Sequence, residues 1–206
     1  MKHEFGGVRI FIFAALSAVL FAAGVVQAQT APELPVTFTA NVVKAADTGA
    51  LPTRMSLTIE RWSTDAERQD LLQALQEGGT ERLVAAMHGL DVGYVQMQKG
   101  LGKRVRVASL WQTDEGQLIR VATDRPFTAG PRLGGTRSLE YPIGVIEIRL
   151  PSEGDGEGTF YEATRVKFNE QGQIEIHSMQ QDTGPRRLLG VKQEKKKQKK
   201  EKKSES

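Results

Sequence analysis

The 206-residue chain contains no cysteine, only three histidines and few aromatic residues, which make up 6% of it. Without cysteine it has no disulfide framework, no thiol nucleophile and no residue for a lipid anchor on sulfur. Only His88 and His177 lie beyond the first 28 residues, which leaves little for histidine-based metal or nucleophilic chemistry. The sequence also lacks the G-x-S-x-G pattern of α/β-hydrolases and the H-E-x-x-H pattern of zinc proteases. No cofactor is predicted.

The N-terminal 28 residues have the pattern of a secretory signal peptide. Lys2 and Arg9 precede an apolar run over residues 10–26 that one serine interrupts. This run of 17 residues is shorter than the roughly 20 that span a membrane, and small residues follow it at the positions that signal peptidase reads. We therefore expect cleavage after Ala28 rather than an uncleaved anchor. The mature protein would be soluble and periplasmic or extracellular.

The basic pI of 9.2 comes from the C-terminal end of the chain. Residues 192–206 carry eight lysines and three glutamates, whereas residues 29–191 carry 18 basic and 21 acidic residues. We expect a disordered Lys-rich tail, because none of its side chains can enter a core. The tail either binds an anionic envelope surface such as lipid headgroups or acts only as a solubilising end. Nucleic acid is a less expected partner, since the tail has no aromatic residues for base stacking.

Between these ends, residues 29–191 are predicted to form a single, mainly β domain. Apolar and polar residues alternate, with turn residues between them, in about eight segments: 36–44, 54–62, 92–98, 103–113, 117–123, 141–150, 158–168 and 173–179. Most neighbouring segments are joined by connections of hairpin length. The pattern therefore predicts an antiparallel meander that forms a barrel or a strongly curled sheet.

A change of period after the second strand predicts a pair of helices. Thr64 and Glu67 match a capping box, Gly78–Gly79 ends the first helix, and Thr80 is suited to cap a second, shorter one. Two helices of this length cannot bury their apolar faces alone, so we expect them to cover the sheet. Trp62, just before the pair, is predicted to pack under the first helix.

Two groups of residues on the predicted strands are candidates for a functional site. His177 shares a strand face with Glu175 and could act as an acid or base, although a solvated pair explains the same pattern. Arg104 and Arg106 share one strand face, with Trp111 opposite together with two valines. The arginines could bind an anion, and a solvated strand face is the simpler interpretation.

An acidic, glycine-rich segment is the nearest approach to a metal motif. Glu153, Asp155 and Glu157, followed by Gly158, imitate the first half of a calcium-binding loop. The twelfth position of such a loop is Thr164 rather than a glutamate. We therefore interpret the segment as a flexible hairpin turn and predict no metal site.

Several segments of the body resemble small exported bacterial proteins that have no assigned activity. The similar segments are residues 60–68, 77–79, 92–94, 122–126 and 156–158. They consist of turns, helix caps and strand positions. The resemblance therefore implies export and a common fold, and it implies no catalytic residue.

These observations leave three functional hypotheses open. The favoured one is a non-enzymatic exported module that binds a small ligand or an envelope partner, with the interior of a small barrel as the ligand cavity. The second is a periplasmic hydrolase that uses carboxylates, with His177 as acid or base. The third is a structural subunit of an envelope assembly, for which an exposed apolar patch would be the sign.

Overall fold

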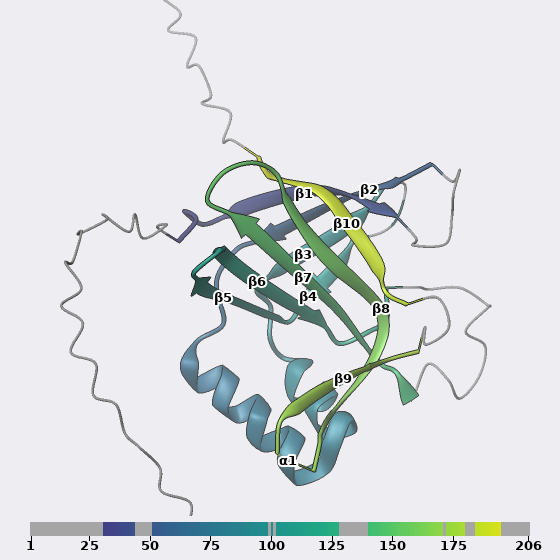
Figure 1. Ribbon diagram of the computed structural model, residues 1–206. Helices are drawn as coiled ribbons and strands as arrows, with labels where there is room; N and C mark the ends of the chain where they lie inside the picture. Colours follow the sequence, from purple (N-terminus) through teal and green to yellow (C-terminus); the bar gives the residue numbers. More distant parts are fainter. Residues whose placement is uncertain are drawn as a thin grey trace, which may run out of the picture.

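The computed structural model describes residues 31–43, 51–98, 100, 102–127, 140–170, 172–179 and 184–194. Within these ranges, ten strands form one antiparallel sheet that curls into a nearly closed barrel, and one kinked helix lies outside it (Figure 1). The predicted fold, mainly β with a helical unit after the second strand, is confirmed. No helix among these residues combines the length and the apolarity needed to cross a membrane.

The two strands at the ends of the sheet are consecutive in the chain. The strands are β1 (Val36–Val43), β2 (Thr53–Ile59), β3 (Gly93–Met97), β4 (Lys103–Val105), β5 (Val107–Thr113), β6 (Gly116–Thr123), β7 (Ile143–Pro151), β8 (Gly156–Phe168), β9 (Ile174–Ser178) and β10 (Arg186–Gln193). Their hydrogen-bonded order is β4-β3-β2-β1-β10-β8-β7-β6-β5, with β9 beside the end of β8. β4 is the first strand of this order and β5 the last, and only Arg106 separates them in the chain. The two edges of the sheet therefore lie close together, which nearly closes the barrel.

The irregularity at Arg106 also changes which side chains face inward. Val105 and Ala108 both belong to the core inside the barrel, whereas Val107 packs on the outer side of the sheet. The prediction that Val105, Val107 and Trp111 share a face is therefore wrong for Val105. Strict alternation fails here because Arg106 separates two strands, and the pattern of inward and outward residues shifts between them.

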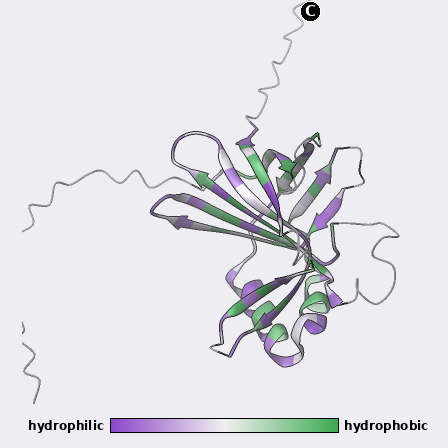
Figure 2. Ribbon diagram, turned by 45° about the vertical axis from the view of Figure 1, so that its right-hand side comes forward, coloured by the Kyte–Doolittle hydropathy of each residue, from purple (hydrophilic) through white to green (hydrophobic). Residues whose placement is uncertain are grey.

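The interior of the barrel is a packed apolar core, unlike the ligand-holding interior that the sequence suggested. Hydrophobic and hydrophilic positions alternate along the strands (Figure 2), which directs one set of side chains inward. The largest of these are at most 1% exposed: Phe38, Met55, Leu57, Ile59, Ile119, Ile146, Ile148, Phe160 and Leu188. Trp62, for which a position under the first helix was predicted, packs against this core.

The helix α1 (Asp65–Met87) consists of two helical segments, as predicted. Gly78 and Gly79 have non-helical backbone angles between them, and φ of Gly79 is +62°. Thr80 does not cap the second segment; its hydroxyl donates to the carbonyl oxygen of Val166 in β8, 2.6 Å away. This bond ties the second segment to the sheet.

The C-terminal part of the body forms a strand that the sequence analysis did not define. β10 lies between β1 and β8 and continues through Lys192, whose ammonium group lies 3.2 Å from a carboxylate oxygen of Asp155. β10 therefore includes Lys192 and Gln193, the first two residues of the predicted tail. The predicted signal peptide with its cleavage at Ala28, and residues 195–206 of the predicted tail, lie outside the described residues.

Candidate ligand-binding groove

A groove of about 320 Å³ lies between α1 and the outer face of the barrel. α1 and β9 are both located on this side of the barrel, below it in Figure 1. Most of the side chains that line the groove are apolar and come from α1, β5, β6, β7, β8 and β9: Leu71, Leu72, Leu75, Leu83, Met87, Val107, Trp111, Val121, Ala122, Ile143, Val145, Val166, Ile174 and Ile176. Of the lining residues that the structure describes, three are polar: Arg68, Ser109 and Arg120.

Strand register accounts for the change of polarity across the outer face of the barrel. Val107, Ala122 and Val145 are direct cross-strand neighbours on β5, β6 and β7, and they form an apolar row under α1. A second row across the same strands lies two residues further along β5. It consists of Ser109 on β5, Arg120 on β6 and Glu147 on β7. The apolar floor of the groove therefore borders directly on a charged row of the same sheet.

Large apolar side chains at this groove remain open to solvent. Leu72 of α1, Trp111 of β5 and Ile174 of β9 are 41%, 42% and 49% exposed. They are half of the large hydrophobic residues that are exposed in the described part of the chain. Contiguous exposed apolar surface of this kind typically marks a binding site.

Arg120 lies at the polar border of the groove and is part of a three-residue charge cluster. Its Nη2 is 2.6 Å from Glu147, and its guanidinium lies 5.4 Å from the ring centroid of Trp111. Glu147 is only 12% exposed and also pairs with Arg149, at 2.5 Å. Two cations thus share one carboxylate, and the cluster carries a net charge of +1.

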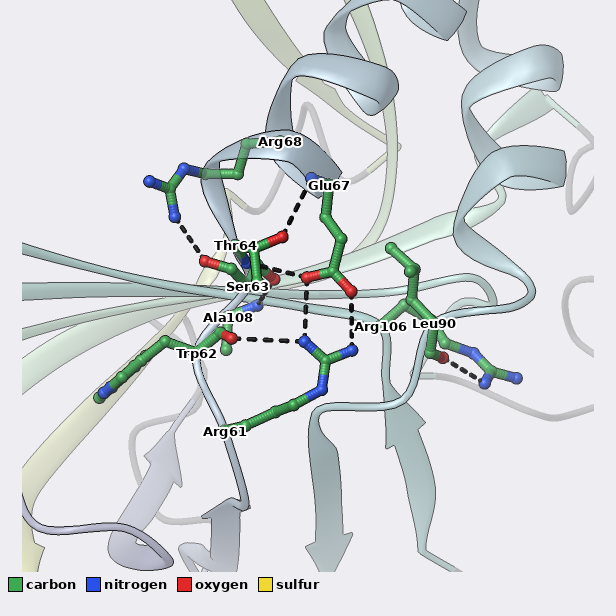
Figure 3. Close-up of polar contacts among 9 residues, drawn as sticks. All are labelled: Arg61, Trp62, Ser63, Thr64, Glu67, Arg68, Leu90, Arg106 and Ala108. Atoms are coloured by element: carbon green, nitrogen blue, oxygen red, sulfur yellow. Dashed lines mark hydrogen bonds and ion pairs between the residues drawn. The ribbon is translucent and has the colours of Figure 1, made fainter.

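A set of polar contacts fixes the start of α1 on β5 and so positions the helical side of the groove (Figure 3). Ser63 and Ala108 exchange two hydrogen bonds, of 2.8 and 3.0 Å. Arg61 donates to both carboxylate oxygens of Glu67, and the amide of Thr64 donates to one of them. The hydrogen bonds from Arg61 and from the Thr64 backbone lower the pKa of Glu67 to about 2.

The end of α1 is attached to the sheet through a buried carboxylate. Asp124, which follows β6, lies 3.0 Å from Nδ1 of His88 and 3.1 Å from Nε of Arg106. Burial would raise the pKa of Asp124, but the contacts with Arg106 and His88 outweigh it and lower the pKa. The pKa of nearby Lys103 is lowered by burial and by the charge of Arg125.

The two arginines predicted as an anion site are both engaged within the protein. Arg106 donates to the carbonyl oxygen of Leu90, at 2.6 Å, in addition to its ion pair with Asp124. Arg104 pairs with Asp91, at 3.3 Å. The Arg104 and Arg106 side chains therefore connect strands to the segment after α1, and neither lines the groove.

His177 and Glu175 form the pair that the sequence indicated. Their side chains are 2.9 Å apart, and the contact lowers the pKa of Glu175. The groove is lined by their neighbours in β9, Ile174 and Ile176, and His177 is not among its lining residues. His177 thus lies on the same strand as the groove residues but outside the groove.

The acidic segment Glu153 to Glu157 includes the turn between β7 and β8, as the hairpin interpretation predicted. Gly154 has a φ of +90°, a conformation that favours glycine in a tight turn. Asp155 pairs with Lys192, and Glu157 lies 3.7 Å from Arg187. Across the described residues, no three carboxylate or histidine side chains form a group that could hold a metal ion.

Arg120 and Ile174 line the groove, but the sequence pattern gave no sign of it. Arg120 alternates with apolar neighbours like any solvated strand residue, and Ile174 is the first residue of a five-residue strand. Trp111 lines the same groove, but the sequence placed it with two valines on the apolar side of its strand and so gave no signal of a site. Trp111, Arg120 and Ile174 line one groove only because of the strand register and the position of α1.

Comparison of the chain with family models, with curated proteins and with solved structures gives no match. The groove is therefore interpreted from its own geometry and chemistry.

Proposed function

We propose that the protein is an exported, non-enzymatic binding module that holds the hydrocarbon chain of a small amphiphile in the groove between α1 and the barrel. The observation that carries this proposal is the continuity of the apolar lining with the exposed side chains of Leu72, Trp111 and Ile174. Covering this surface is favourable by about 25 cal/mol per Å² of apolar area. A ligand would supply that cover.

The size of the groove limits the ligand. Cavities for small molecules measure about 300 to 1,000 Å³, and this groove, at about 320 Å³, is at the lower end. At about 30 Å³ per heavy atom, the share of one water in the liquid, it accommodates roughly ten heavy atoms. A chain of about eight carbons with a small head fits this volume.

The two ends of the chain support the exported part of the proposal. The first 28 residues have the composition of a secretory signal, and the lysines after residue 194 would hold the module loosely at an anionic envelope surface. Such a location would place the groove where amphiphiles are abundant.

The proposal is tested by titrating the protein with octan-1-ol, a neutral probe of the predicted size, in a calorimeter. We expect saturable binding that Leu72→Ala weakens by about fivefold, since the substitution removes part of the apolar lining. Leu189→Ala is the matched control: Leu189 is 37% exposed on β10 and does not line the groove, so binding should be unchanged.

A second variant fills the groove instead of trimming it. Ala122→Phe places a ring on the floor of the groove, at the centre of the apolar row, and should abolish octan-1-ol binding while circular dichroism retains the strand signal. Absence of saturable binding by the unaltered protein would overturn the proposal. Binding that neither groove substitution changes would overturn it as well.

A further inference from the structure

We infer that the groove selects amphiphiles with an oxyanion head, a carboxylate or a phosphate, and that Arg120 binds this head at the polar border of the groove. The inference rests on the proposed function and specifies its ligand class. Its starting point is the charge of the lining. Among the described residues that line the groove, the two charged ones are arginines, Arg68 and Arg120, and none is a carboxylate.

Of these two arginines, Arg120 is the one whose charge is available to a ligand. Arg68 forms an ion pair with Asp65 of the same helix and donates to the carbonyl oxygen of Ser63, 2.6 Å away, so it is committed to the start of α1. Arg120 shares Glu147 with Arg149. Arg120 is thus part of a cluster with a surplus positive charge.

The shared carboxylate lets Arg120 exchange partners without leaving a buried charge alone. Glu147 is 12% exposed, and an unpaired carboxylate at that position would be costly. When Arg120 turns its N–H groups toward a ligand, Arg149 still neutralises Glu147. The aromatic ring of Trp111 remains beside the Arg120 guanidinium and favours a planar fork that can bind an oxyanion through two parallel hydrogen bonds.

The position of Arg120 matches the geometry of an amphiphile. Arg120 immediately precedes Val121 and Ala122 of the groove lining and is the cross-strand neighbour of Ser109. Its side chain is 42% exposed, so a head bound there stays in contact with water while the hydrocarbon chain runs along the apolar row under α1.

The test compares three eight-carbon probes: octanoate, octyl phosphate and octan-1-ol. At least one of the two anions should bind about tenfold more tightly than the alcohol, the effect of one charge-assisted hydrogen bond, and added salt should reduce that advantage. The anion with the larger advantage identifies the head as carboxylate or phosphate.

Arg120→Gln should weaken binding of the preferred anion by about tenfold and change octan-1-ol binding by less than about twofold. Arg187→Gln is the matched control: Arg187 is an exposed arginine on β10 that lies near Glu157, and it does not line the groove. Arg149→Gln should also weaken anion binding, because Glu147 would then hold Arg120 by itself.

The two proposals fail in distinguishable ways. If all three probes bind with equal affinity, the charge selection is overturned and the apolar groove stands. If anions are preferred but Arg120→Gln has no effect, the assignment to Arg120 is overturned. If no probe binds, the groove itself is not a ligand site and both proposals are overturned.

Discussion

Glu67 combines two stabilising contacts in one side chain. Its carboxylate closes the capping box at the start of α1 and receives both hydrogen bonds of the Arg61 fork. The pKa of Glu67 is lowered from 4.5 to about 2. A lowered pKa means that the folded state favours the ionised carboxylate, so the stabilisation is complete above about pH 4.5 and disappears as the pH falls toward 2.

We predict that Glu67→Gln lowers the free energy of unfolding by about 0.5 to 1 kcal/mol at pH 7, because glutamine keeps the cap but loses the charge that pairs with Arg61. The difference from the unaltered protein should shrink between pH 4.5 and pH 2. Urea unfolding at several pH values measures both effects. Glu77→Gln is the control on the same helix: Glu77 pairs with Arg82 and accepts a hydrogen bond from Gln73, both at exposed positions, so the change should be smaller. A pH-independent difference at Glu67 would contradict the assignment.

Core and groove residues should differ sharply in their contribution to stability. Phe160 is 1% exposed inside the barrel and stacks against Phe127 with ring centroids 4.6 Å apart. We expect Phe160→Ala to lower the free energy of unfolding by about 3 to 5 kcal/mol. Leu72→Ala, at an exposed position of the groove, should lower it by less than about 1 kcal/mol. Thermal unfolding distinguishes the two, and equal losses would show that the groove is part of the core.

At the level of single residues, the sequence predicted the capping box and the His177–Glu175 pair, because both depend on neighbours within three positions. It could not predict that Arg106 pairs with Asp124. That contact depends on the break between β4 and β5 and on the position of the residue that follows β6. Local pattern contains neither piece of information.

Gly79 determines the angle between the two segments of α1, and both segments line the groove. With φ of +62° and ψ of −154°, it occupies a region of backbone space that is essentially restricted to glycine. We predict that Gly79→Ala costs about 1 to 3 kcal/mol of stability and weakens octan-1-ol binding, since Leu72 and Met87 would no longer face the same space. Urea unfolding and calorimetry report the two effects.

Gly89→Ala is the control for this prediction. Gly89 follows the second segment of α1, and a Cβ there would meet no atom within 4 Å. Stability and binding should be close to those of the unaltered protein. A loss at Gly89 as large as that at Gly79 would contradict the view that backbone conformation, rather than helix propensity, is responsible.

At the level of elements, alternation located most strands because their inward and outward residues differ clearly in polarity. The break at Gly78–Gly79 likewise revealed the helical pair. β10 was not defined, because its residues expose leucine and glycine on the outer side and lysine near its end. Its identity as a strand comes from its partners, β1 and β8.

At the scale of the whole molecule, the Lys-rich end should determine membrane affinity. A chain ending at Glu194 retains all of β10, including the Lys192–Asp155 pair, and loses only the residues that follow. We predict that it sediments with anionic vesicles less than the full chain does, and that salt removes the difference. Equal binding by both chains at low salt would contradict the tether.

The proposed export can be tested by the mass of the mature protein. The protein recovered from the periplasm or medium of a bacterial host should begin at Gln29, as measured by intact-mass spectrometry. Replacing Ala28 by a bulky residue such as phenylalanine should leave the precursor uncleaved. Recovery of a precursor with residues 1–28 from the unaltered sequence would support an anchor instead.

The groove itself could not have been predicted at this scale. Its lining comes from one helix and five strands that are distant in sequence, and it exists only because α1 lies over one particular apolar row of the barrel. The sequence did indicate a β domain with a helical pair on it. Where the pair would lie was not encoded in any local pattern.

The placement of α1 has a consequence for how this protein can change over time. β2 and β3 are antiparallel neighbours, with Ile59 opposite Gly93, so the whole helical unit is an excursion between two strands that a short turn could join. The barrel buries its own core, and α1 contributes to a second, separate cluster on the outside. Substitutions in the excursion would therefore alter the lining of the proposed groove while the barrel keeps the chain folded, so the lining is free to diverge faster than the architecture.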